Sequence, residues 1–334
     1  MTTENSTTDA DPTGIRRVVV GVDGSESALH AAFWAAAEAE SRGVPLTLEH
    51  AANLPSAAVA PLEPDEYAER QQAAGAELMD AVAAQIRERH PGLAVDAEIS
   101  PLSPTHRLTE VSAPDVLIVT GTRGHGGFTG MLLGSVSRAL AAHANGPLVV
   151  VRGPAPEDAS GTVVLGVGPS PAESAIDYAF AAALRHRTSL HVVRAWMPQL
   201  PIVGAGLPGG AAFSLGEPGG LFTSELRDSN EDETADAVRA IESVRDRYPQ
   251  VKVEVTAVTS NPVPALTDAA SDARLIVVGA HRRRGPFAVG AGYVVEGLLS
   301  HSPAPVAVVP VDLEHAAGDA EDEAGDAQHE AQPQ

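Results

Sequence analysis

Short apolar runs alternate with alanine-rich, charged stretches of helical length along most of the chain. In the first half, the runs at 17–22, 116–120 and 147–151 are dominated by valine, leucine and isoleucine. Continuous apolar runs of this length predict strands that are buried on both faces. The intervening stretches, such as 27–42 and 64–89, have the length and composition of helices. Strands and helices in strict alternation predict a parallel sheet covered by helices on both sides.

The same succession of elements occurs a second time. Gly21 and its counterpart Gly166 are 145 positions apart, whereas Gly121 and Gly279 are 158 positions apart. The second copy therefore carries a net insertion of 13 residues, which we place in the glycine- and proline-rich stretch at about 197–220. Such a composition is typical of a surface loop. The corresponding runs are 18–25 and 163–170, 46–51 and 190–195, 116–121 and 275–279, and 147–151 and 305–309.

This internal repeat divides the chain into two domains. We expect the first at 15–152 and the second at 162–310, with a linker at 153–161 between them. Residues 1–14 are predicted to form a disordered N-terminal tail. The stretch 311–334 is acidic and contains no lysine or arginine, so that we expect a disordered acidic tail, with an interaction arm as the alternative.

Composition excludes several classes of function. The chain has 334 residues, with 44 acidic and 22 basic side chains and a formal charge of −22. A nucleic-acid partner is therefore not expected, because such proteins neutralise phosphates with basic patches. There is no cysteine, and hence no disulfide or thiolate metal site. The chain has no long apolar run and no signal-peptide pattern, so that we expect a cytoplasmic protein without membrane contact.

A glycine-rich loop carries the main chemical signal. Gly121, Gly124, Gly134 and Ser135 follow the apolar run at 116–120 with the spacing G-x2-G-x9-G-[ST]. Glycines at a strand-to-helix turn let backbone amides approach an anion, and the helix start presents further donors. The pattern predicts a phosphate-binding loop, with a simple connecting turn as the alternative.

An acidic residue ends the first predicted strand. Asp23 would lie beyond the carboxyl end of that strand, where open parallel sheets bind ligands. There its carboxylate could accept hydrogen bonds from ribose hydroxyls. The alternative is a carboxylate that accepts backbone N–H bonds within its own turn.

The phosphate contacts cannot follow the P-loop pattern, which places a lysine directly after the glycines. The only lysine is Lys252, far from the loop. Phosphates would instead be held by backbone amides and by the hydroxyls of Ser135 and Ser137. Arg123 and His125 also lie inside the loop, where they could touch phosphate or simply be solvated.

The segments 20–25, 121–124 and 134–137 together resemble the motifs of the universal stress protein (UspA-like) family, and the resemblance extends over about 15–310 as in a tandem member. It implies an α/β fold of two Rossmann-like domains, each with a five-stranded parallel sheet flanked by helices. It also implies pairing of domains through their last strands, either in a homodimer or as an intramolecular pseudo-dimer.

The resemblance further implies an ATP-binding protein with a regulatory role in the stress response. Carried over to this chain, Asp23 would bind ribose and the main chain of Ala51 would lie near adenine. The phosphates would be bound by Gly121, Gly124, Gly134 and Ser135, with Ser137 as a further candidate. We expect Mg²⁺ to arrive with the nucleotide, because the sequence shows no carboxylate cage for it.

The second copy departs from this pattern. Gly168 replaces the aspartate, Arg282 the second loop glycine, and Tyr293 the serine. We therefore expect the second domain not to bind ATP in the same way. The basic run at 281–284, beginning at His281, could bind a different anion through arginine forks, or could be a solvated surface loop.

No catalytic motif of the G-x-S-x-G or H-E-x-x-H type is present. An ATP-binding regulatory module is the first hypothesis. A slow ATP-hydrolysing enzyme is the second, because positioning and a metal supply part of phosphoryl-transfer catalysis. A protein–protein scaffold without nucleotide is the third.

Overall fold

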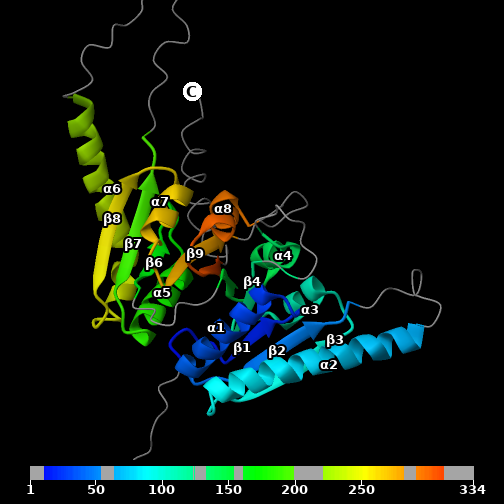
Figure 1. Ribbon diagram of the computed structural model, residues 1–334. Helices are drawn as coiled ribbons and strands as arrows, with labels where there is room; N and C mark the ends of the chain where they lie inside the picture. Colours follow the sequence, from blue (N-terminus) through cyan, green and yellow to red (C-terminus); the bar gives the residue numbers. More distant parts are fainter. Residues whose placement is uncertain are drawn as a thin grey trace, which may run out of the picture.

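In the computed structural model, all the strands of the described residues belong to one continuous sheet (Figure 1). The structure describes residues 11–53, 64–122, 124, 133–153, 161–198, 221–281 and 291–311. The predicted linker at 153–161, the insertion at 197–220 and both tails fall largely outside these ranges. Within them, strands and helices alternate through two copies of a β-α-β-α-β-α-β-α-β unit, as the apolar pattern predicts.

The first copy contains β1 (Arg17–Gly21), α1 (Glu26–Arg42), β2 (Leu46–Ala51), α2 (Pro64–Arg89), β3 (Val95–Ser100), α3 (Pro104–Val111), β4 (Val116–Gly121), α4 (Ser135–His143) and β5 (Leu148–Val151). The second contains β6 (Val163–Gly166), α5 (Glu173–Arg185), β7 (Leu190–Trp196), α6 (Leu221–Arg245), β8 (Val253–Thr259), α7 (Pro262–Ala269), β9 (Leu275–His281), α8 (Tyr293–His301) and β10 (Val306–Val311).

The strand order is β3-β2-β1-β4-β5-β10-β9-β6-β7-β8. Neighbouring strands are parallel within each copy, whereas β5 and β10 pair in antiparallel fashion, with Val150 opposite Val306 and Leu148 opposite Val308. Each copy thus has the five-stranded parallel sheet that the sequence predicts, and the fold class is confirmed. The last strands join the two sheets within one chain.

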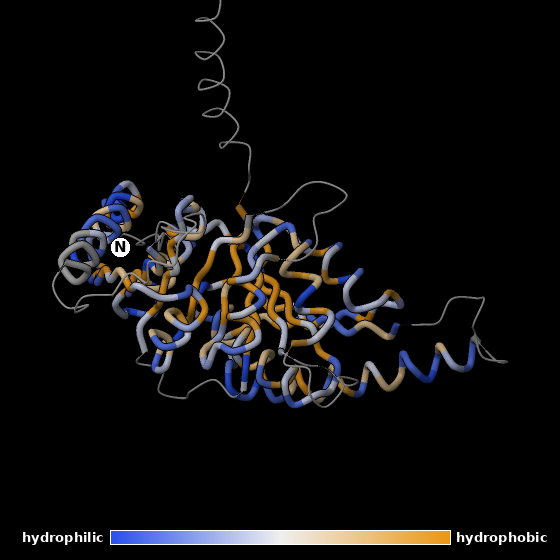
Figure 2. The backbone as a smooth tube through the Cα atoms, turned by 90° about the horizontal axis from the view of Figure 1, so that it is seen from above, coloured by the Kyte–Doolittle hydropathy of each residue, from blue (hydrophilic) through white to orange (hydrophobic). Residues whose placement is uncertain are grey.

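Two hydrophobic cores lie on opposite faces of the sheet. Helices α1, α2, α5 and α6 cover one face and α3, α4, α7 and α8 the other. Successive strand residues point to opposite cores: Val18 and Val20 belong to the first and Val19 to the second. Figure 2 shows the apolar strands enclosed by helices with polar outer surfaces. Burial on both faces explains why the strand sequences are continuously apolar.

Helix α1 is bounded by clear local signals. The Ser25 hydroxyl accepts a hydrogen bond from the Ala28 N–H at 3.1 Å, and Gly43 ends the helix with a left-handed φ of 68°. Its inner face is alanine, including the fully buried Ala31 and Ala35. Small side chains let α1 pack closely on the sheet, so that its N-terminus is held beside the ends of β1 and β4.

A buried ionic cluster joins the two copies on the α1 side of the sheet. We call it the interdomain cluster; it consists of Asp11, Glu38, Arg42, Arg185 and His186. The Glu38 carboxylate accepts hydrogen bonds from Arg42 Nε at 2.9 Å and Arg185 Nη2 at 2.8 Å, and lies 3.1 Å from His186 Nε2. Burial by itself raises the pKa of Glu38, but Arg185, Arg42 and His186 lower it to well below its usual value.

Asp11 belongs to the predicted disordered tail, yet it lies in this cluster. Its side chain is buried and forms an ion pair with Arg42, and Arg42 Nη1 also donates to Thr13 Oγ1 at 2.9 Å. Residues 11–14 therefore pack against the first domain, in contrast to our expectation for that part of the tail. The reason is a buried partner 31 positions away in the sequence, which local composition does not reveal.

Candidate functional site

A cavity of about 650 Å³ lies beyond the carboxyl ends of β1, β2 and β4. The site is a topological switch point, because the chain continues from β1 to β2 on one side and reaches β4 on the other. The residues that the resemblance assigns to ribose, adenine and phosphate all line it: Asp23, Ala51, Gly121, Gly124, Gly134, Ser135 and Ser137. Residues up to 114 positions apart thus meet in one place.

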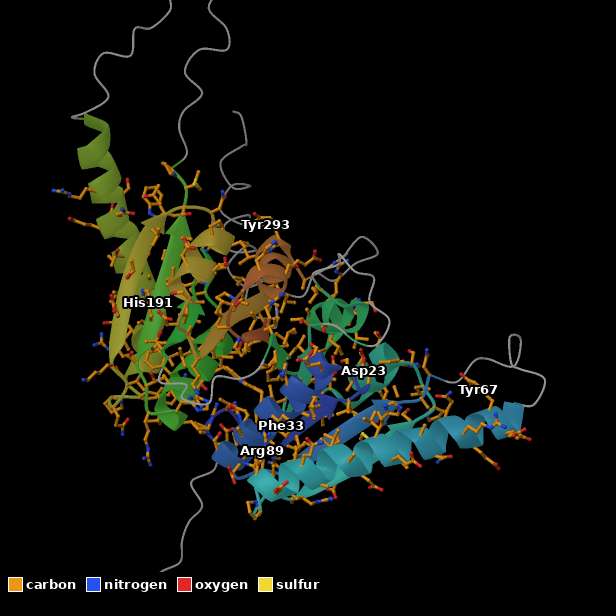
Figure 3. The ribbon with its side chains drawn as sticks, in the orientation of Figure 1. Asp23, Phe33, Tyr67, Arg89, His191 and Tyr293 are labelled. Atoms are coloured by element: carbon orange, nitrogen blue, oxygen red, sulfur yellow. The ribbon has the colours of Figure 1, made fainter. Side chains whose placement is uncertain are left out.

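Asp23, labelled in Figure 3, lies in the turn between β1 and α1. Its Oδ1 accepts hydrogen bonds from the Ser25 N–H at 3.0 Å and the Ser25 hydroxyl at 2.6 Å. The carboxylate therefore accepts hydrogen bonds within its own turn, as the alternative interpretation of Asp23 predicts. A carboxylate accepts up to about four hydrogen bonds, so that the turn contact orients the group without excluding a ligand contact.

The first two loop glycines have a packing role. A Cβ at Gly121 would lie 2.6 Å from the carbonyl oxygen of Ser27, and a Cβ at Gly124 would collide with the carboxylate of Asp23. Only glycine allows the end of β4 to approach the start of α1, and the loop to approach Asp23. The glycines therefore contribute to the shape of the cavity.

The third glycine precedes α4. Gly134 occupies the N-cap position without a side-chain cap, and its N–H donates to the Thr122 carbonyl at 2.7 Å. The first turn of α4 begins at the exposed Ser135. A helix N-terminus carries a partial positive charge and unpaired N–H groups. This end of the cavity therefore has the electrostatic character that suits an anion.

Ser137 has a different environment from Ser135. It is 2% exposed, its hydroxyl donates to the Gly121 carbonyl at 2.8 Å, and its Oγ lies 3.2 Å from Thr120 Oγ1. A hydroxyl has one proton to donate, and in Ser137 that proton is used within the protein. These contacts tie α4 to the end of β4, and phosphate binding by Ser137 stays a prediction.

The structure adds an ion pair that the motifs do not include. Glu49 on β2 and Arg107 on α3 line the cavity, with Arg107 Nε 2.7 Å from Glu49 Oε1 and Nη2 3.3 Å from Oε2. Arg107 also pairs with Glu98 at 2.5 Å and Glu110 at 3.5 Å. Burial raises the pKa of Glu49, although Arg107 acts in the opposite direction. In the sequence, the signal for this ion pair was Glu49, a charged residue within the predicted strand at 46–51.

Some nominated side chains lie outside the described residues. These are Arg123 and His125 of the first loop, the arginines of the basic run at 281–284, and the His281 side chain. In the second copy, Gly168 follows β6 and Tyr293 begins α8 with 71% of its surface exposed (Figure 3). Neither residue provides a counterpart to the Asp23 carboxylate.

Each copy of the internal repeat matches a known protein family. A sequence model of the universal stress protein family matches residues 14–152 and 160–310. The chain belongs to the universal stress protein family. The tandem arrangement inferred from the internal repeat is thereby confirmed.

Similar proteins of Mycobacterium tuberculosis carry the same family name. Universal stress protein Rv1996 is 31% identical over 321 residues, covering 90% of this chain and 96% of that relative. Universal stress protein Rv2623 is 32% identical over 303 residues, covering 87% and 95%. A universal stress protein from Archaeoglobus fulgidus matches with a TM-score of 0.63 and 18% identity over 88% of this chain and 96% of that chain. This last likeness shows a shared fold.

No helix among the described residues has both the length and the apolar character needed to cross a membrane. No group of three or more histidine and acidic side chains in the same part of the chain is arranged to hold a metal ion.

Proposed function

We propose that the first domain of this universal stress protein binds ATP, and that the bound nucleotide regulates its part in the stress response. The observation that carries this proposal is the convergence of the predicted ribose, adenine and phosphate residues on one cavity at a topological switch point. The cavity volume of about 650 Å³ lies within the usual range of ligand pockets.

The proposed roles follow the chemistry of each group. The Asp23 carboxylate, oriented by Ser25, accepts hydrogen bonds from the ribose hydroxyls. The adenine lies near the main chain of Ala51. The phosphates are bound by backbone amides at Gly121 and Gly124 and by the start of α4 at Ser135, which Gly134 positions, while Ser137 keeps α4 in place.

Binding of the triphosphate is expected to require Mg²⁺. Among the described residues that line the cavity, Arg107 is the only basic side chain, and it already pairs with three carboxylates. A divalent ion that arrives with the nucleotide would offset the phosphate charge. We expect chelation of Mg²⁺ to weaken ATP binding by about tenfold or more, as measured by calorimetric titration with and without EDTA. Equal affinity under both conditions would contradict this role for the ion.

Removal of the Asp23 carboxylate tests the site directly. We expect one ATP per chain in the wild type and a loss of affinity of about tenfold or more in Asp23→Ala, because hydrogen bonds to a charged group contribute roughly 1.5–3 kcal/mol. The measurement is calorimetric titration of the full chain with ATP and Mg²⁺. Asp96→Ala is the matched control, since Asp96 is exposed on the edge strand β3 and does not line the cavity.

The number of sites and the fate of ATP separate the alternatives. Two equal sites would contradict a second domain that does not bind ATP. Phosphate release beyond one equivalent per chain would favour the slow ATPase. Absence of binding, or binding unchanged in Asp23→Ala, would favour the scaffold.

A further inference from the structure

The second domain has a cavity at the position equivalent to the first. It measures about 380 Å³ and lies beyond the carboxyl ends of β6 and β9. Gly166, Gly279 and Leu266 line it, and their counterparts Gly21, Gly121 and Leu108 line the first cavity. The second copy has therefore kept the hollow at its switch point.

The polar side chains around that hollow have been replaced. Matching the two copies element by element gives Gly168 in place of Asp23, Val193 in place of Glu49, Ala265 in place of Arg107, Val278 in place of Thr120 and Val295 in place of Ser137. Four of these replacements, Gly168, Val193, Val278 and Val295, line the second cavity. At these positions, all within the described residues, the second cavity therefore has no counterpart of the Glu49–Arg107 ion pair or of the Thr120–Ser137 hydroxyl pair of the first cavity.

The backbone that follows β6 is also less able to bind an anion than the backbone that follows β1. Pro169 and Pro171 follow Gly168, and proline has no N–H to donate. The Gly168 carbonyl accepts a hydrogen bond from Arg194, whose Nε pairs with Glu233 at 2.7 Å. Among the described lining residues, Ser170 has the only polar side chain.

These replacements reverse the ligand preference of the hollow. Moving a charged group into a site without partners carries a large desolvation penalty, whereas covering apolar walls with an apolar molecule is favourable. A cavity of this volume, lined mostly by aliphatic side chains, has the properties of a small-molecule site. We propose that the second domain binds a small, uncharged, apolar molecule, so that the two domains of the chain carry different ligands.

The test uses a neutral apolar probe whose fluorescence rises in an apolar site, N-phenyl-1-naphthylamine, titrated into the full chain. We expect saturable binding of one probe per chain that excess ATP and Mg²⁺ do not displace. In Gly168→Leu we expect probe binding to be lost and ATP binding to be retained. A Cβ at Gly168 meets no atom within 4 Å and the residue has no positive φ, so that the new side chain enters open space at the cavity without backbone strain.

The matched control is the same change at the equivalent position of the first domain. Asp23→Leu is expected to lose ATP binding and to retain the probe. A second variant, Val278→Thr, changes shape little but adds a hydroxyl that an apolar ligand would cover, and we expect affinity for the probe to fall about tenfold.

Three outcomes would overturn the proposal. They are no saturable probe binding by the wild type, equal probe binding by the wild type and folded Gly168→Leu, or displacement of the probe by ATP. Probe binding by the wild type and by Gly168→Leu is compared without nucleotide, so that failure of the ATP proposal would leave this comparison intact.

Discussion

Arg42→Ala is expected to lower the free energy of unfolding by about 3–5 kcal/mol, because it leaves the two buried carboxylates of the interdomain cluster with Arg185 as their only remaining arginine partner. The Arg42 side chain is fully buried and pairs with Glu38 and Asp11, which are almost equally buried. Its Nη2 also donates to the hydroxyl of Tyr178 in the second domain at 3.2 Å. The measurement is equilibrium unfolding in urea, followed by circular dichroism.

The chain supplies a closely matched control for this effect. Arg70 pairs with Glu66 four residues earlier in α2, as Arg42 pairs with Glu38 in α1, but the Arg70 side chain is 75% exposed. We expect Arg70→Ala to change the free energy of unfolding by less than about 0.5 kcal/mol. Similar small losses in both variants would show that the cluster contributes little to stability.

Gly121→Ala is expected to lower the free energy of unfolding by about 1–3 kcal/mol and to abolish ATP binding by the first domain. The new Cβ would lie 2.6 Å from the Ser27 carbonyl oxygen and 2.7 Å from its carbon. Because these are backbone atoms at the start of α1, relief requires β4 and α1 to move apart at the wall of the cavity. Thermal unfolding and ATP titration of the same variant measure the two effects.

Gly279 is the equivalent glycine of the second domain and provides the comparison. A Cβ there would meet the side-chain atoms Ala172 Cβ at 3.1 Å and Val311 Cγ2 at 3.2 Å. The Val311 side chain can rotate, and the Ala172 contact needs a shift of only a few tenths of an ångström, so that we expect Gly279→Ala to be milder and to leave ATP binding unchanged. If Gly121→Ala binds ATP like the wild type, the close approach of β4 to α1 at Gly121 is not needed for ATP binding.

Local patterns were sufficient for most of the fold. The predicted helix at 64–89 coincides with α2, and the apolar runs became β1, β4 and β5. These elements could be predicted because strands buried on both faces must be apolar throughout and helices between them must carry one apolar face. The glycine spacing and Asp23 identified the walls of the first cavity for a similar reason, since the loop geometry constrains residue type locally.

Contacts between distant residues could not be predicted in this way. Glu49 and Arg107 are 58 positions apart, and Glu38 and Arg185 are 147 positions apart. Although Glu49 lies within a predicted strand, the local sequence does not show which charged residue pairs with which. The tertiary structure also decided that the Ser137 hydroxyl donates to the Gly121 carbonyl, 16 positions away in the sequence.

The sequence by itself determined the two α/β copies, the position of the glycine loop after β4 and the loss of Asp23 and Ser135 counterparts in the second copy. Periodicity and glycine placement are local requirements of the backbone, and they are therefore written in consecutive residues. Only the tertiary structure decided that β5 and β10 join the copies into one sheet, that an ionic cluster is buried between them, and that the described residues around the second hollow are mostly aliphatic. Those features depend on which side chains come into contact after folding. The free-energy cost of burying a charge or a hydroxyl depends on the partners that surround it, and not on the residue type alone.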